Sequence, residues 1–89
     1  MIAHATNDAA AELLLRALAA TLGEPRRAER FLTLTGLDAE ELRRRVGEPS
    51  LLGALLDFLE SHEPDLVAVA EDVGVTPARL VAARGGLTA

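Results

Sequence analysis

The 89-residue chain contains no cysteine, tryptophan, tyrosine or lysine, and these absences exclude several classes of protein. Without cysteine it can form neither a disulfide nor a thiolate centre, which fits a reducing compartment. No apolar run approaches the roughly 20 residues that a membrane-spanning helix requires. The N-terminus lacks the basic region and apolar run of a secretory signal. We therefore expect a soluble cytoplasmic protein.

Aromatic residues are limited to Phe31 and Phe58, and β-branched residues are scarce. Alanine and leucine, which have the highest helix propensities, dominate the apolar half of the composition. The length suits a single domain with one core. The sequence therefore predicts one all-α domain spanning residues 1–89.

Charge is unevenly distributed along the chain, whose formal net charge is -5. Residues 1–47 carry seven arginines and seven acids, whereas residues 48–89 carry two arginines and seven acids. Phosphate binding depends on a clustered positive face, so the acidic second half argues against a nucleic-acid footprint there.

An internal repeat is the strongest pattern in the sequence. Gly36-Leu37-Asp38-Ala39 recurs 38 residues later as Gly74-Val75-Thr76-Pro77. With the same offset, Leu13, Leu14, Ala17 and Leu18 correspond to Leu51, Leu52, Leu55 and Leu56. Such repeats are supersecondary units that share a core. The pattern predicts a compact six-helix bundle built from two tandem three-helix, helix-turn-helix-like repeats, approximately 8–47 and 48–86.

Helix boundaries follow from capping residues, prolines and glycines. We expect a first helix from about Asp8 to Leu22 with Thr6 or Asn7 as N-cap, and a second from Pro25 to Gly36. Asp38 and Glu41 form a capping box for the third. Pro49, Pro64 and Pro77 open the remaining three, with Gly74 ending the fifth helix, Thr76 capping the sixth and Gly85-Gly86 ending it.

The segment from Val69 to Arg84 is similar to the helix-turn-helix of many bacterial regulators. Gly74 takes the position of the turn glycine and Ala70 that of the small residue four positions earlier. The outward positions offer few base-reading side chains, chiefly Arg79 and Arg84, and Glu71 and Asp72 lie where phosphates would approach. Packing of two short helices without DNA also produces this pattern, and we favour that interpretation.

The only basic cluster comprises Arg43, Arg44 and Arg45, with Arg26, Arg27 and Arg30 on the preceding helix. One interpretation is a solvated face, in which the arginines offset the helix dipole and form Glu40–Arg44 and Glu41–Arg45 pairs. The other is a docking patch for an acidic protein segment, including the acidic half of a second copy.

Four apolar residues exceed what a single inward stripe requires: Leu13, Leu51, Phe58 and Val67. Either the core is broad enough to bury them, or they form a partly exposed patch that recruits a partner or a second copy. We expect the broad core.

Candidate catalytic chemistry is sparse. No set of cysteine, histidine and carboxylate residues has the spacing of a metal site, and neither Ser50 nor Ser61 has a base identifiable from spacing. His4 and His62 stand apart. We therefore expect no catalytic, cofactor-binding or metal-binding residues and no enzyme activity.

Phe31-Leu-Thr-Leu-Thr-Gly-Leu-Asp, Leu42-Arg-Arg-Arg, Gly47-Glu-Pro and Leu55-Leu-Asp-Phe-Leu together resemble domain of unknown function 3572. The resemblance extends from about Ala9 to Gly85. It implies a short, helical, stand-alone bacterial cytoplasmic protein, and it carries no catalytic, metal or ligand residue with it.

These patterns favour a non-catalytic protein-interaction or adaptor module, which binds a protein partner or self-associates as a homodimer. The candidate contact residues are Arg43, Arg44, Arg45 and Phe58. The alternative is a helix-turn-helix transcriptional regulator that binds DNA through Arg79 and Arg84.

Overall fold

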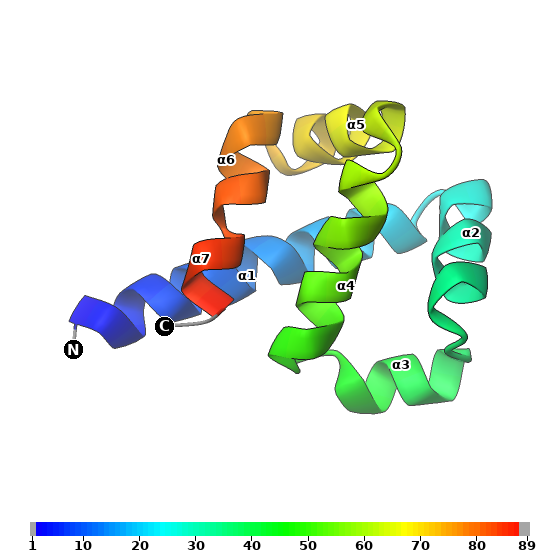
Figure 1. Cartoon of the computed structure of the whole chain (residues 1–89), viewed down its shortest axis with the longest axis horizontal. Helices are drawn as coiled ribbons and strands as arrows, with labels where there is room; N and C mark the ends of the chain where they lie inside the picture. The colour runs from blue at the N-terminus through cyan, green and yellow to red at the C-terminus, as the bar shows by residue number, and fades with distance from the viewer. Residues whose placement is uncertain (1, 88–89) are drawn as a thin grey trace.

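The structure, a computed structural model, describes the backbone of residues 2–87 and the side chains of residues 9–87 (Figure 1). The described backbone contains helices and no strands. The helices are α1 (Ile2–Leu22), α2 (Pro25–Thr35), α3 (Ala39–Arg45), α4 (Pro49–Glu60), α5 (Glu63–Val73), α6 (Pro77–Ala82) and the single turn α7 (Arg84–Leu87). The all-helical class is confirmed, with α7 added to the six helices expected.

Side-chain caps begin three of these helices. Asp38 accepts a hydrogen bond from the Glu41 N–H at 2.8 Å, and Thr76 accepts one from the Arg79 N–H at 3.1 Å. The Glu24 carboxylate accepts from the Arg26 and Arg27 N–H groups. The hydrogen bond from the Arg26 N–H is the main cause that lowers the pKa of Glu24, and burial opposes it. The caps expected at Asp38 and Thr76 are therefore confirmed.

Glycines in the left-handed region end α2 and α5, as expected. Gly36 has a φ of 73° and Gly74 a φ of 83°, and the N–H group of each donates back to the preceding helix. A side chain would be strained at both positions.

Two predicted helix ends are wrong. α1 begins at Ile2, so Thr6 and Asn7 lie inside the helix and neither is its N-cap. The first residues contain no proline or glycine to stop helix growth, and several are alanines. Gly85 and Gly86 lie within α7 and do not end α6, because Leu87 packs against the core and holds this last turn in place.

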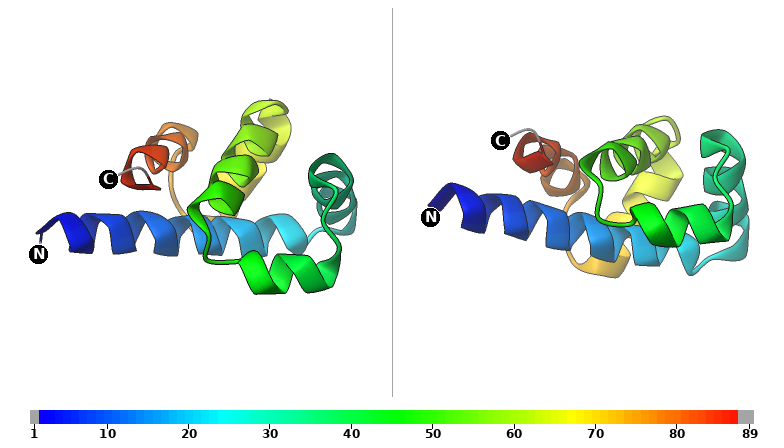
Figure 2. Two further views of the ribbon diagram at one scale, coloured as in Figure 1. Left: turned by 60° about the horizontal axis from the view of Figure 1, so that its bottom comes forward. Right: turned by 90° about the horizontal axis from the view of Figure 1, so that it is seen from below.

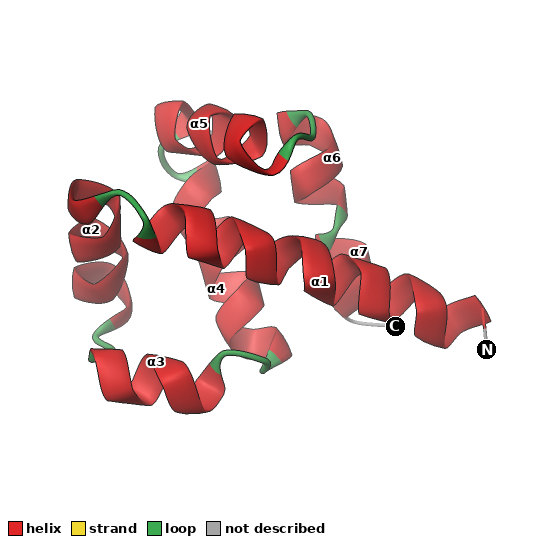
Figure 3. Cartoon of the chain, turned by 180° about the vertical axis from the view of Figure 1, so that it is seen from behind, coloured by secondary structure: helices red, strands yellow, loops and turns green. Residues whose placement is uncertain are grey.

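Helix α1 forms the axis of the molecule and runs along its whole length (Figure 1). It packs most extensively against α5 and α7, and also against α2 and α4. In Figure 3 it crosses in front of α4, and Figure 2 shows α4 and α6 on the same side of it. α3 lies at the periphery. The radius of gyration, 12.3 Å, is typical of a compact domain of this size.

The core is rich in leucine and contains one aromatic pair. Phe31 of α2 and Phe58 of α4 pack edge to face, with ring centroids 5.4 Å apart. The fully buried side chains around them include Leu14, Leu52, Leu55, Leu56, Leu59, Val69 and Leu80. Burying leucine side chains supplies about 1.5–3 kcal/mol each, the main stabilisation of the fold.

The 38-residue offset seen in the sequence also relates helix boundaries. α2 occupies 25–35 and α5 occupies 63–73, while α1 and α4 end at Leu22 and Glu60. The helices nevertheless do not form two separate units, since α1 packs more against α5 and α7 than against α2. The two-repeat architecture therefore stays a prediction.

Candidate functional site

Leu34, in the last turn of α2, is the most exposed large apolar side chain of the described residues. It is 65% exposed, whereas Leu15, Val46 and Val67 are 37–40% exposed. The neighbouring Phe31 is fully buried. Leu34 therefore marks a surface that the fold leaves uncovered.

Two hollows flank Leu34, and Leu34 lines both. The first has a volume of about 510 Å³ and is lined by Glu29, Arg30, Thr33, Leu34, Phe58, Ser61 and His62. The second has a volume of about 290 Å³ and is lined by Leu34, Thr35, Leu37, Arg45, Leu51, Ala54 and Asp57. Each lies between α2 or its C-terminal turn and α4, so the two hollows form one groove, which we call the α2–α4 groove.

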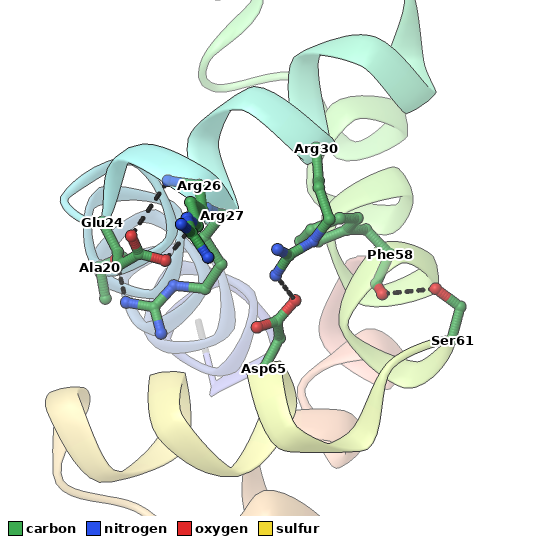
Figure 4. Close-up of polar contacts among 8 residues, drawn as sticks. All are labelled: Ala20, Glu24, Arg26, Arg27, Arg30, Phe58, Ser61 and Asp65. Atoms are coloured by element: carbon green, nitrogen blue, oxygen red, sulfur yellow. Dashed lines mark hydrogen bonds and ion pairs between the residues drawn. The ribbon is translucent and has the colours of Figure 1, made fainter.

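Phe58 belongs to the floor of this groove and not to an exposed patch. Its side chain is only 4% exposed because it packs on Phe31, and Ser61 Oγ donates to the Phe58 carbonyl at 2.7 Å (Figure 4). Leu13 and Leu51 are also buried, and only Val67 of the four surplus apolar residues is exposed. The broad core is therefore the correct interpretation, and the alternative patch is not formed.

Arginines of α2 connect this helix to α5. Arg30 is paired with Asp65, and Arg27 Nη2 lies 3.5 Å from Asp72 Oδ2. Arg27 also donates to the Ala20 carbonyl at 3.0 Å (Figure 4), and its buried Nε has no hydrogen-bond partner among the described residues. These two side chains hold α2 in place and do not extend the basic cluster of α3, contrary to the grouping that the sequence suggested.

The arginines at the end of α3 divide into two kinds. Arg45 pairs with Glu48 at 2.9 Å and reaches Ser50 at 3.4 Å. Arg43 and Arg44 are exposed and form no ion pair among the described residues. The expected Glu40–Arg44 and Glu41–Arg45 pairs are not formed among the described residues, and Arg45 pairs with Glu48 instead of Glu41. Of the three arginines only Arg45 lines a hollow of the α2–α4 groove, and Arg43 and Arg44 line neither hollow.

The predicted helix-turn-helix segment has the expected apolar contacts. Val69, Ala70 and Leu80 are fully buried around the turn at Gly74. Of the two base-reading candidates, Arg79 is exposed, but Arg84 Nη2 lies 2.9 Å from Glu60 and 2.8 Å from Asp57. The hydrogen bonds that Arg84 donates to the carboxylates, chiefly that of Glu60 and then that of Asp57, raise the pKa of Arg84. Arg84 therefore links α7 to α4, and a phosphate would compete for it with two carboxylates.

The described side chains include no group of three or more His, Cys, Asp or Glu that could hold a metal ion. Ser50 and Ser61 are engaged with Arg45 and the backbone. His62 precedes α5 and lines the first hollow, and His4 lies outside the described side chains. No described helix has the length and hydropathy to cross a membrane.

Fold and site together define a small all-helical protein with an open apolar groove on its surface. The chain belongs to the DUF3572 family, a family of proteins of unknown function, whose model matches residues 7–89. The resemblance found in the sequence is thereby confirmed. No curated protein and no solved structure matches the chain.

Sequence reasoning missed Leu34, which lies at the centre of the groove. The inward stripe of α2 comprises Ala28, Phe31, Leu32 and Thr35, and Leu34 stands outside it. An apolar residue beside a complete inward stripe was the signal that could have identified it.

Proposed function

We propose that the chain is a non-catalytic protein-interaction module whose docking surface is the α2–α4 groove. The observation that carries this proposal is the exposure of Leu34 between two hollows. A projecting leucine beside a hollow is typical of an interface, where a few anchoring side chains supply most of the binding energy.

We include the exposed Arg43 and Arg44 of α3 in the proposed surface as an electrostatic element. Neither forms an ion pair among the described residues, so an acidic segment of a partner gains contacts without breaking one of the ion pairs seen there. Exposed charges of this kind accelerate association and favour acidic partners more than they add affinity. Phe58 contributes as the floor on which the partner packs.

Two further features belong to the proposal. The coincidence of helix boundaries at an offset of 38 residues supports a tandem three-helix repeat as the origin of the fold. The absence of cysteine supports a reducing, cytoplasmic location. The bacterial origin is what the family resemblance implies.

A DNA-binding regulator remains the second candidate, because α5, the left-handed Gly74 and the Thr76-capped α6 have the order of a helix-turn-helix. Against it stand the exposed Glu71 and Asp72 and the engagement of Arg84 with two acids. Salt separates the two candidates, since phosphate contacts lose affinity steeply with salt and apolar protein contacts do not.

The test is affinity capture from native lysate, with and without nuclease, using the wild type, Leu34→Asp and the control Val67→Asp. Val67 is 40% exposed on α5 and lines neither hollow. We expect one protein, or untagged copies of this chain, to be retained by the wild type and the control, and lost with Leu34→Asp. If Leu34→Asp captures the same protein as the wild type, the proposal is overturned. If nuclease abolishes the capture, the DNA-binding candidate is favoured.

A further inference from the structure

The segment between Gly23 and Gly47, which contains α2 and α3, contributes little to the core. In this fully described segment only Phe31 and Leu42 are buried apolar side chains, and two further leucines are partly buried. Helix α4, about as long as α2, buries six apolar side chains by itself. Segments with few buried apolar contacts open at a lower free energy than the core of the same protein.

The backbone of this segment is also weakly attached to the other helices. α3 makes only weak contacts with them, and α2 packs against α1 and α4 but approaches the α5 backbone at few points. Both helices lie on the side of the molecule away from the two termini (Figure 1). A glycine stands at each end, Gly23 before Glu24 and Gly47 after Val46. Because glycine allows a wide range of φ and ψ, the chain can change direction at both ends without strain.

Two arginines of α2 bridge the distance to α5. Arg30 pairs with Asp65, and Arg27 Nη2 lies 3.5 Å from Asp72 Oδ2. The position of Arg27 is not fully satisfied, because its buried Nε has no hydrogen-bond partner among the described residues. A buried donor without a partner lowers the net stabilisation that the rest of its side chain supplies. These ion pairs therefore hold α2 against α5 with little support from apolar packing between the two helices.

We propose that residues 24–46, which we call the α2–α3 flap, open as one unit while α1 and α4–α7 stay folded. Opening breaks both ion pairs between α2 and α5 and withdraws Phe31 from Phe58. Helices of 11 and 7 residues are too short to persist alone in water, so the flap loses its helical hydrogen bonds once it is detached. Because α2 carries one wall of the α2–α4 groove, the groove exists only while the flap is closed.

The related α5–α6 segment does not meet the same conditions. α5 packs extensively against α1, and α6 packs against α5 and α7. Val69, Ala70 and Leu80 of this segment are fully buried. The two segments share a turn with a left-handed glycine and a capped second helix, so one serves as the internal control for the other.

The first experiment is native-state hydrogen exchange of the full chain, measured for each amide at urea concentrations below the unfolding transition. Amides of α2 and α3 are expected to share one opening free energy, lower than that of α1, α4 and α5. Their exchange should also depend less on urea, because opening of the flap exposes less surface than global unfolding. If the protected amides of all five helices share one opening free energy and one urea dependence, the proposal is overturned.

Two matched cap variants give a sharper test. Asp38 caps α3 within the flap and Thr76 caps α6 outside it, and each accepts one backbone hydrogen bond at an exposed position. Asp38→Ala should accelerate exchange about fivefold in the flap and in the other helices. Thr76→Ala should accelerate exchange by a similar factor in α1, α4 and α5 only, since its cap stays intact when the flap opens.

The decisive readout is the exchange of the flap amides in Thr76→Ala. If they accelerate as much as those of α5, the flap opens only together with the rest of the molecule, and the proposal is overturned. Circular dichroism checks that both variants are folded.

A third variant tests the ion pairs between α2 and α5. Arg30→Met removes the partner of Asp65, so exchange of the flap amides should rise about tenfold. The control Arg79→Met removes an exposed arginine of α6 that forms no ion pair among the described residues, and it should change no rate in the flap. If Arg30→Met also leaves the flap rates unchanged, the ion pair does not hold the flap and the proposal is overturned.

These measurements use the free chain, so they are independent of the proposed function. If the flap does not open separately, the groove is permanently formed and the interaction module stands. If the flap opens but Leu34→Asp captures the same protein as the wild type, only the proposed function fails.

Discussion

The α2–α3 and α5–α6 segments have the same local structure but different surroundings. Each consists of a helix ended by a left-handed glycine and a second helix with a side-chain cap, at an offset of 38 residues. Leu80 of α6 is fully buried, whereas its counterpart Leu42 is 7% exposed on the peripheral α3. The difference teaches that local sequence sets the turn, whereas the surrounding helices decide how completely the second helix is buried: α6 packs against α5 and α7, and α3 packs less against the other helices.

The largest expected effect in this comparison comes from Leu80→Ala. Removing a fully buried leucine leaves a cavity, so we expect a loss of about 2–5 kcal/mol in the free energy of unfolding. Leu42→Ala should cost at least about 1 kcal/mol less, because the surroundings of α3 can collapse around the smaller side chain. Urea denaturation of both variants measures the difference, and equal losses contradict the contrast between the two segments.

A smaller loss of stability is expected when the ion pair between α2 and α5 is broken. Asp65 is 8% exposed and pairs with Arg30, so Asp65→Asn should destabilise the fold by about 1–2 kcal/mol. The matched control is Asp38→Asn, which exchanges one good N-cap for another and should be nearly neutral. If the two variants have the same urea midpoint as the wild type, the Arg30–Asp65 pair contributes nothing to holding α2.

The two turn glycines should behave alike. No atom lies within 4 Å of a Cβ added at Gly36 or Gly74, so only the positive φ opposes alanine. We expect about 1 kcal/mol of destabilisation for Gly36→Ala and for Gly74→Ala. Thermal denaturation measures the two variants. If one of them lowers the melting temperature much more than the other, the two turns differ in more than their surroundings.

The smallest effect concerns the Glu24 cap, which begins α2 and has no counterpart in α5, where His62 makes no side-chain cap hydrogen bond. The pKa of Glu24 is lowered in the folded state, chiefly by the Arg26 N–H. Its stabilisation is therefore present above the unfolded pKa of 4.5 and is lost as pH falls through the lower folded pKa. Glu24→Gln should lower the melting temperature slightly at about pH 7 and not at about pH 3. A difference that persists unchanged at low pH indicates that the carboxylate charge is not the cause.

Much of the fold could be predicted because its signals are local. Asp38, Thr76, Gly36 and Gly74 act on neighbouring backbone groups, and each does what its residue type predicts. The predicted start of the first helix is wrong because Thr6 and Asn7 can cap a helix but do not prevent one from continuing. The predicted helix end at Gly85-Gly86 is wrong because Leu87 contacts the core and this contact stabilises an additional helical turn.

The candidate site was less predictable. Phe58 and Leu34 are both apolar residues outside the simplest inward stripe, and the sequence does not distinguish them. Phe58 is covered because Phe31 meets it from α2, and Leu34 is exposed because α4 leaves hollows on either side of it. The arginines of α2 and α3 look like one cluster along the chain, yet Arg27 and Arg30 find acids on α5.

The sequence by itself determined the helical class, the main turns and the leucine-rich core, because propensity, capping and apolar periodicity act within a few residues along the chain. Only the tertiary structure decided which leucine lies at the surface, which arginines remain unpaired, and where a groove opens. Those properties depend on how close helices distant in the sequence approach one another, and the α2–α4 groove is formed by residues of helices that are not adjacent in the chain.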